Sequence, residues 1–584
     1  MTAKAELPAD ATGLSAPRAV EPRSGFSWVD LAVVALVALS VLLVLGIVRG
    51  WRSSLQAGSE ISLEARHLPL YTFLSLTRGV VAYGVSFLFT MVYGYAMARI
   101  AGAERVMLPL LDIFQSIPVL GFMPGFVLGM ARLFPQQHLG LEIASILMIF
   151  TGQAWNMTFS FYASLKSVPP DLVAVARLAR MSWWRRFFRL DLSYAATGLV
   201  WNSMMSMAGG WFFLMVSEAF LLGEKDFRLP GLGSYVSLAI ERGDGMAQLL
   251  GILSLLAMIV AVDQVIWRPL VVWSRKFSAE EDEGAGSSTL WTKLRSRSRI
   301  WRAVGLGIAL VRKHWPFRGI RSLPSSAEIN SKKALFGKLV GGVVVGMLVA
   351  GGLAGAVKYG WMLAPLSWGD WGRLLGSTGV TMSRVVVAVA VASLWTIPVG
   401  VLIGTHPRWA RSLQPVIQIA ASFPAPMIFP LVVGVMLARG VGLGVSSGLL
   451  LLLGAQWYIL FNVIAGASGI PRELREVGLM ARFSLLQRWR MLILPSILPS
   501  LITGWITAVG GAWNASIVAE YMKYKGRILL TTGLGATISQ ATEQGDFGVL
   551  AAAVGIMAVT VTGLNRVLWR PLGEWARGRC SLET

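Results

Sequence analysis

Four charged side chains stand near the ends of long apolar segments of the sequence. Arg78 and Arg384 lie early in one such segment each, and Glu218 and Glu520 lie late in another. Ionisable residues in apolar segments are candidates for function by default, because taking a charge out of water is costly. The two arginines could attract an anion, or each could extend to an interface with water. A carboxylate repels anions, so gating or packing against arginine is favoured over ligand binding for the glutamates.

A Ser-x-Pro pattern recurs within two of the apolar segments. Ser116 and Pro118 form the first instance, and Ser422 and Pro424 form the second. Proline leaves a helix carbonyl without its partner, so the pattern either opens backbone polar groups toward a cavity or only kinks the helix. Both readings remain open.

Paired glycines precede a tryptophan in two other segments, Gly209–Trp211 and Gly510–Trp513. Small residues let neighbouring helices approach closely, and this packing role is the favoured reading. The alternative is that these segments line the path of a solute.

The sequence carries no indication of catalysis. The single cysteine, Cys580, excludes an intrachain disulfide and a cysteine-based metal site. No Gly-x-x-x-x-Gly-Lys-Ser/Thr phosphate loop occurs in the 584 residues, so the chain does not hold ATP phosphates by that route. We therefore predict no catalytic residues, no metal and no cofactor.

The elements that position these residues are expected to be membrane helices. Charged residues make up 14% of the chain and hydrophobic residues 55%, whereas about 25% of residues are charged in soluble globular proteins. Runs such as 31–48 and 336–356 approach the ~20 apolar residues that cross a bilayer. The net charge of +22 fits the basic loops of a membrane protein, so no nucleic acid partner is expected. The predicted fold class is an all-α polytopic membrane protein.

The sequence is also duplicated. Residues 152–275 align without a gap when shifted by 302 positions, which carries Trp155 to Trp457 (457 − 155), and the shift becomes 306 further upstream, carrying Arg78 to Arg384. A period this long indicates a repeated domain. Repeats in membrane proteins place the working site between them.

Two asparagines break the repeat. Asn156 and Asn514 have Tyr458 and Phe212 at the equivalent positions of the other copy. They are either asymmetric polar contacts for a small solute or interhelical hydrogen bonds, and the second reading is favoured.

Each copy is predicted to have six spans, and an even number gives both copies the same orientation, related by a pseudo-twofold axis along the membrane normal. The twelve spans are expected near residues 31–48, 72–98, 107–130, 142–165, 194–221 and 246–272, and near 336–358, 377–404, 413–437, 445–468, 496–519 and 547–571.

The charge pattern predicts the orientation and the domains. Basic residues concentrate in alternate loops, which places both termini in the cytoplasm. The linker is either partly disordered or contains an interfacial amphipathic helix from Trp291 to Lys313. The expected parts are a disordered tail (1–27), a first membrane domain (28–273), a cytoplasmic linker (274–335) and a second membrane domain (336–584).

Two short charged stretches interrupt the apolar segments at equivalent places. Each has a proline and an acidic residue near its start, which suits a helix N-terminus, and each repeats an apolar stripe. Such a helix either lies on anionic lipid or binds a soluble partner, and the duplication favours a twofold partner. The residues predicted for this contact are Asp171, Leu172, Val175, Ala176, Ala179 and Arg180, and Glu473, Leu474, Glu476, Val477, Gly478, Ala481 and Arg482.

The second stretch resembles the EAA loop of type I ABC importer permeases, which reads Glu-Ala-Ala, three residues, Gly, and ends in Leu-Pro. Here the loop is Glu476–Gly478, three residues, Arg482 and then Leu494–Pro495. The run from Pro109 to Pro124 and the two regions around Glu218 and Glu520 are similar to the permeases for nitrate, sulfonates, taurine and bicarbonate. The chain resembles a fused, duplicated form of these proteins.

The resemblance implies that each short helix is a coupling helix that docks in a groove of an ATPase subunit. Two ATPase subunits in trans would then rock the two copies, and a periplasmic or lipid-anchored substrate-binding protein is a further candidate partner. The chain departs from the pattern at Arg180 and Arg482, where the loop has Gly, and at Ala174 and Ser193, where it has Glu and Pro. The two copies are therefore expected to contribute unequally.

The sequence thus predicts the permease subunit of an ATP-driven importer in a bacterial inner membrane, carrying a small anionic solute inward. An ion-gradient-driven secondary transporter of twelve spans is the alternative, and it would need buried acids for coupling. Asp112 and Asp263 are the few acids near spans, and Asp263 becomes Asn565 in the second copy. A scaffold or sensor without flux is a third reading.

Overall fold

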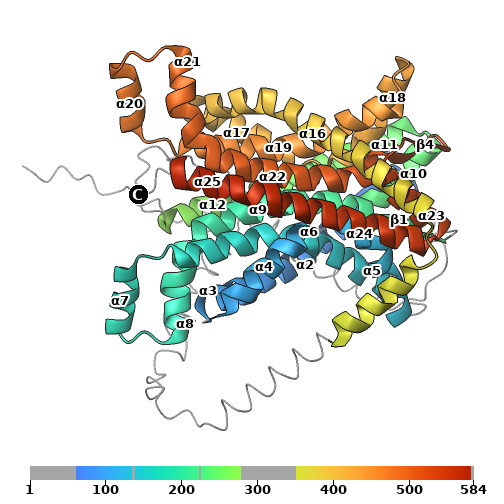
Figure 1. Ribbon diagram of the computed structural model, residues 1–584, viewed down its shortest axis with the longest axis horizontal. Helices are drawn as coiled ribbons and strands as arrows, with labels where there is room; N and C mark the ends of the chain where they lie inside the picture. Colours follow the sequence, from blue (N-terminus) through green and yellow to red (C-terminus); the bar gives the residue numbers. More distant parts are fainter. Residues whose placement is uncertain are drawn as a thin grey trace, which may run out of the picture. The chain divides into compact units, whose positions relative to one another are not determined.

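The computed structural model is helical, with two short β-hairpins (Figure 1). All the residues that it describes belong to one packing unit. The expected tail, the first expected span and nearly all of the linker lie outside these residues. The described ranges are 61–100, 102–116, 118–134, 138–222, 225–277 and 350–580.

The first copy runs from a long helix through a broken helix pair and two further long helices to a hairpin and a final helix. Short π-helical turns connect α2 to α3, α8 to α9 and α11 to α12. Its elements are α2 (Leu68–Phe89), α3 (Tyr95–Arg99), α4 (Ala103–Ser116), α5 (Val119–Leu133), α6 (His138–Lys166), α7 (Pro170–Leu178), α8 (Trp183–Arg186), α9 (Leu192–Glu218), β1 (Ala219–Leu222), β2 (Lys225–Arg228), α10 (Leu232–Arg242), α11 (Gly245–Val262) and α12 (Arg268–Ser274).

The second copy repeats this order after a helical segment at residues 350–363. Its elements are α16 (Trp368–Thr405), α17 (Pro407–Ser422), the 3-10 turn η7 (Ala425–Met427), α18 (Phe429–Ala438), α19 (Leu443–Ser468), α20 (Arg472–Met480), α21 (Leu485–Gln487), α22 (Leu494–Ala519), β3 (Tyr521–Tyr524), β4 (Arg527–Leu530), α23 (Leu534–Gln544), α24 (Phe547–Leu564) and α25 (Arg570–Cys580).

Equivalent elements begin at equivalent residues of the two copies. Helices α9 and α22 begin at Leu192 and Leu494, and α10 and α23 begin at Leu232 and Leu534, in both cases with the 302-residue shift of the sequence repeat. From α7 to α12 the duplication is therefore carried into the fold element by element, whereas α16 is continuous where the first copy has α2 and α3, and η7 with α18 stands in the place of α5.

Seven described helices are long and apolar enough to cross a membrane, or eight if the bent pair α4–α5 forms one span. Helix α6 has 29 residues but is not among the seven. The expected span 31–48 and the beginning of the expected span 336–358 lie outside the described residues. The chain is thus a multi-pass membrane protein, while the count of twelve stays a prediction.

The third expected span of each copy is not a continuous helix. In the first copy α4 ends at Ser116, and α5 begins after Pro118 with a bend of 95°. In the second copy α17 ends at Ser422, and Pro424 precedes η7 and α18. The prolines break these spans because they lack the amide hydrogen that would continue the helix. The Ser-x-Pro pattern thus coincides with a break in the helix in both copies.

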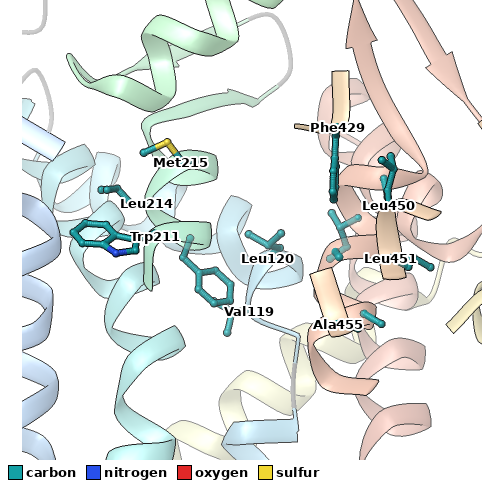
Figure 2. Close-up of a cluster of buried hydrophobic side chains, with 14 of the residues drawn as sticks. Val119, Leu120, Trp211, Leu214, Met215, Phe429, Leu450, Leu451 and Ala455 are labelled. Carbon is teal, nitrogen blue, oxygen red and sulfur yellow. The ribbon is translucent and has the colours of Figure 1, made fainter. Parts of the chain in front are cut away.

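A shared hydrophobic core joins the copies. Within the first copy α9 packs on α6, and within the second α22 packs on α19. One cluster of buried side chains takes residues from both copies, as Figure 2 shows for part of it. Its labelled members are Val119 and Leu120 of α5, Trp211, Leu214 and Met215 of α9, Phe429 of α18, and Leu450, Leu451 and Ala455 of α19.

Candidate functional site

Arg78 lies in a buried ion-pair network. Its guanidinium donates to both carboxylate oxygens of Glu142, at 2.6 and 2.7 Å, and to Glu218 Oε1 at 2.7 Å. All three side chains are at most 6% exposed. Glu218 also accepts from the Ser75 hydroxyl and from the Gly233 amide. The network therefore connects α2, α6, the end of α9 and the start of α10.

The second copy repeats this network with one carboxylate fewer. Arg384 donates to Glu520 Oε1 at 2.9 Å, and Glu520 accepts from Thr381 and from the Gly535 amide. The position equivalent to Glu142 is Gly444 (142 + 302). In place of that carboxylate Arg384 donates to the Thr531 hydroxyl, and it also donates to the Thr532 carbonyl as Arg78 does to the equivalent Pro230 carbonyl.

These networks position the elements at one end of the long helices. The carboxylate of Glu218 or Glu520 caps the helix that follows the hairpin, where free amide groups favour negative charge. Each arginine candidate for anion attraction is thus paired with a carboxylate. Neither arginine lines the large cavity described next, so an anion-binding role for them stays a prediction.

A cavity of about 1220 Å³ lies between the two copies. We call it the chamber. Its walls come from α4 and α6, with a few residues of α9, and from α22, α24 and α25, with Gly454 and Tyr458 of α19. Asn156 and Asn514 both line it, as do the glycines Gly209, Gly510 and Gly511. Four charged residues are also in the wall: Asp112, Arg566, Arg570 and Glu574.

Asn514 forms part of the contact between the copies. Its side-chain oxygen accepts from the Leu120 amide at 3.4 Å, and its Nδ2 donates to the Gly510 carbonyl at 3.1 Å. One N–H of the amide is left over after these bonds. Asn514 therefore combines an interhelical hydrogen bond with a place on the chamber wall.

The other path candidates lie elsewhere. Trp211 is 2% exposed and Trp513 is fully buried, so both tryptophans belong to the core. Pro424 lines a second cavity, of about 60 Å³, and Ser422 lines a void of about 10 Å³ beside Trp211. Pro118 is buried before α5. Ser116 is the last residue of α4.

The two short helices predicted as coupling helices, α7 and α20, stand apart from the long helices (Figure 1). Leu172 and Val175 of α7 are 43% and 57% exposed, and Val477 of α20 is 55% exposed. In contrast, the small residues Ala176 of α7 and Gly478 of α20 are buried. Leu474 is only partly buried, against the core. The other predicted contact residues are exposed: Asp171, Ala179, Arg180, Glu473, Glu476, Ala481 and Arg482.

Both short helices end in the same left-handed turn. Arg180 has φ 41° and Arg482 has φ 49°. The next residue donates its amide to a carbonyl five positions back, Met181 to Ala176 and Phe483 to Gly478. This is the Schellman pattern, in which glycine usually occupies the left-handed position. The two arginines therefore adopt the backbone conformation that glycine would provide in the EAA loop.

The anchoring of the two short helices was not anticipated from the sequence. In the second copy Arg475 donates to the carbonyls of Thr405 and Ala467, which end α16 and α19. In the first copy the buried Asp191, just before α9, pairs with Arg99 of α3 and Arg186 of α8, so this pairing fixes the region that follows α7. Asp191 and Glu142 are buried acids in or beside apolar segments, so the criterion that selected Glu218 could have found them.

Comparison with known proteins agrees with this geometry. The family described as "binding-protein-dependent transport system inner membrane component" matches residues 88–266 and 396–568, together more than half of the chain. Each match covers one copy, from the second expected span to the last one. The tail and the linker lie outside both matches.

Single relatives match about a third of the chain. The taurine transport system permease protein TauC of Escherichia coli is 27% identical over 35% of this chain and 70% of its own length. The putative aliphatic sulfonates transport permease protein SsuC of Bacillus subtilis is 28% identical over 35% and 71%. The nitrate import permease protein NrtB of Synechococcus elongatus is 27% identical over 34% and 66%.

The family matches the chain at two separate places. The repeated order of helices and the two short exposed helices agree with this double match. The chain belongs to the binding-protein-dependent transport system inner membrane components, the permeases of ABC importers, and it carries the family's domain twice.

Proposed function

We propose that this permease carries a small anion into the cytoplasm, driven by two ATPase subunits that bind at α7 and α20. The names of three relatives, which print taurine, aliphatic sulfonates and nitrate, support an anionic or sulfonated solute. A substrate-binding protein on the opposite face would deliver it. We also propose that the chain is divided into the tail, the two membrane domains and the linker at the boundaries predicted from the sequence.

The pair of short helices is the observation that carries the proposal. Each is nine residues long, buries a small residue, and leaves apolar side chains exposed. Isolated apolar residues on a surface need no explanation, whereas the same arrangement at two equivalent places indicates a binding surface for a twofold partner. Basic residues flank both helices, which supports a cytoplasmic location for them and for both termini.

The alternative function, an ion-gradient-driven transporter, needs buried acids that can take up and release ions. The buried glutamates Glu142, Glu218 and Glu520 are all paired with arginine, and two of them also accept from backbone amides. Carboxylates paired in this way stabilise the contacts between helices and are poorly suited to take up and release ions. This arrangement, together with membership of the family, favours the ATP-driven reading.

The test is charge reversal on the better-matched helix. Glu473→Arg and Glu476→Arg together should abolish co-purification of the ATPase and lower ATP-driven uptake in vesicles by about tenfold or more, since an interface charge turned against its partner costs several kcal/mol. Arg527→Glu, a charge reversal on the exposed strand β4, is the matched control and should change neither. Undiminished association and uptake in the helix variant would overturn the assignment of α20.

A further inference from the structure

The two arginine networks are built from the same parts, with one exception. Arg78 and Arg384 are counterparts in the repeat, and each donates through Nη1 to a glutamate and to a backbone carbonyl. These partners are also counterparts, Glu218 with Glu520 and Pro230 with Thr532. The exception is the side of the guanidinium that carries Nε. The first copy therefore shows how this side is filled in a network that the second copy largely shares.

In the first copy a carboxylate fills this side. Nε and Nη2 of Arg78 donate to the two carboxylate oxygens of Glu142 at 2.6 and 2.7 Å. Two parallel N–H donors are the arrangement with which arginine recognises carboxylates and other oxyanions. Glu142 brings its carboxylate from α6, so no external ligand is needed there, and the Arg78 side chain is only 2% exposed.

In the second copy no carboxylate occupies this place. A Cβ at Gly444 would lie 3.8 Å from Arg384 Nη2, so position 444 faces the arginine as Glu142 does in the first copy. Nη2 donates to the Thr531 hydroxyl at 3.0 Å, whereas Nε donates to no acceptor among the described residues. A guanidinium has five N–H groups, and the bonds to Glu520, Thr531 and Thr532 use three of them. Arg384 thus keeps donors for a further oxygen ligand.

The unused donors lie beside exposed residues. The Arg384 side chain is 14% exposed, and Gly444 and Thr532 next to it are exposed as well. This place is at the start of α19, whose 26 residues extend for about 39 Å toward α20. The opening therefore lies at the end of α19 that is far from the proposed ATPase contact. An imported anion would arrive from this side.

Charge and hydrogen bonding both favour a monovalent oxyanion at this place. The first network combines one arginine with two carboxylates, and the second combines one arginine with one carboxylate. A bound anion with a single charge would give the second network the same charge as the first. The Thr531 hydroxyl accepts from Nη2 and can donate its own hydrogen to the anion. A charged donor and a hydroxyl suit two oxygens of the same ligand.

We propose that Arg384 and Thr531 bind a small oxyanion, such as nitrate or a sulfonate, at the place where the Glu142 carboxylate lies in the first copy. The site is separate from the chamber, which neither Arg384 nor Thr531 lines. The identity of the ligand rests on the proposed import of an anion, whereas the site itself follows from the difference between the two copies.

Chemical modification of arginine tests the site in the full complex, reconstituted in lipid nanodiscs. Phenylglyoxal modifies accessible arginine side chains, and mass spectrometry of peptides reports each position separately. Arg384 should react faster than Arg78 by about tenfold or more, because Arg78 is buried against two carboxylates. Nitrate or methanesulfonate, at about ten times its dissociation constant, should slow the reaction of Arg384 by about tenfold. Chloride lacks the two oxygens that suit this pair of donors and should slow the reaction by less than about twofold.

A single substitution fills the site from within. Gly444→Glu supplies the carboxylate that the first copy has, so the reactivity of Arg384 should fall to that of Arg78, and nitrate should no longer affect it. Gly444→Ala is the matched control, because its Cβ would contact Thr531 Oγ1 at 3.4 Å without adding charge. This variant should keep the protection by nitrate. The thermal unfolding midpoint shows whether each variant folds.

The reciprocal change in the first copy tests the same idea independently, and it decides the question if Gly444→Glu does not fold. Glu142→Gly removes the carboxylate from Arg78 and leaves Glu218 as its partner, as Glu520 is for Arg384. Arg78 should then gain reactivity toward phenylglyoxal, and nitrate should protect it. An Arg78 that stays unreactive, or that nitrate does not protect, would contradict the proposal.

The results separate this proposal from the function on which the choice of ligand rests. Protection of Arg384 by nitrate in a complex without ATP-driven uptake would support the site and overturn the proposed function. Uptake without protection, equal slowing by nitrate and chloride, or protection that persists in Gly444→Glu would overturn the site alone. Protection by an added substrate-binding protein but not by nitrate would mean that a carboxylate of that protein fills the site, which overturns the binding of a free anion.

Discussion

At the scale of single residues, the equivalent arginines Arg78 and Arg384 are in different electrostatic environments. Arg78 faces two carboxylates and is 2% exposed, whereas Arg384 faces one carboxylate and is 14% exposed. A buried ion pair adds little net stability, but removing one partner leaves an uncompensated charge. The cost of removing each arginine therefore depends on how many carboxylates it leaves behind.

Arg78→Gln should destabilise the protein more than Arg384→Gln. The first change leaves both Glu142 and Glu218 buried without their cation, and loss of a buried partner costs about 3–5 kcal/mol. The thermal unfolding midpoint of the purified complex measures the effect, and Arg78→Gln with Glu142→Gln should recover part of the loss. Equal midpoints for the two single variants would contradict the difference in pairing.

The left-handed arginines at the ends of α7 and α20 form a second residue-scale feature. A side chain in this conformation costs about 1–2 kcal/mol, which glycine avoids. Arg482→Gly should therefore slow local hydrogen exchange in α20, and Arg482→Val should accelerate it, because a β-branched residue tolerates positive φ poorly. Gly478→Ala, whose added Cβ would meet no atom closer than 3.7 Å, is the reference for a gain in helix propensity alone and should slow exchange by the equivalent of about 0.5–1 kcal/mol. Identical exchange in the glycine and valine variants would show that the turn carries no strain.

At the scale of elements, the junction between each hairpin and the helix after it is closely packed. A Cβ at Gly233 would lie 2.5 Å from the Met215 carbonyl oxygen and 3.0 Å from the Glu218 side chain. The carbonyl belongs to α9, so it cannot rotate away as a flexible side chain could. Glycine at this position lets the start of α10 reach the carboxylate that caps it.

Gly233→Ala should lower the unfolding midpoint and weaken the network around Glu218, since a backbone collision in a packed region costs about 1–3 kcal/mol. Gly448→Ala in α19 is the matched control, because its Cβ would meet no atom within 4 Å. Alanine there should leave stability unchanged or raise it by about 0.5–1 kcal/mol. A tolerated Gly233→Ala would contradict the close approach.

The sequence predicted those elements whose signal is local or repeated. Helices α7 and α20 follow from a proline, an early acid and an apolar stripe, and the 302-residue shift predicted that equivalent helices start at equivalent residues. The breaks at Pro118 and Pro424 were left open, because proline can kink a helix or end it and only packing decides. The partners of Glu142, Asp191 and Arg475 could not be predicted, since Arg78, Arg99 and Thr405 lie far away from them along the chain.

At the scale of the whole molecule, fusion of two permease domains allows the copies to differ. A homodimer must place the same residue on both sides of its axis. Here Asn514 and its counterpart Phe212 both line the chamber, so the two sides of the same cavity carry different side chains. The duplicated sequence showed that Asn156 and Asn514 break the repeat, but it could not show that both asparagines meet at the same cavity.

The charge of the solute can be tested at Asn514 without disturbing the contact between the copies. Asn514→Asp keeps an oxygen that accepts from the Leu120 amide, so the interface is retained. The new carboxylate repels an anion in the chamber, and two like charges about 4 Å apart in such surroundings oppose each other by about 4 kcal/mol. We therefore expect uptake of the anion to fall by about tenfold or more, with ATPase co-purification unchanged. Asn514→Ser, which removes the amide without adding charge, should lose less activity. Faster uptake in the aspartate variant would indicate a cationic solute instead.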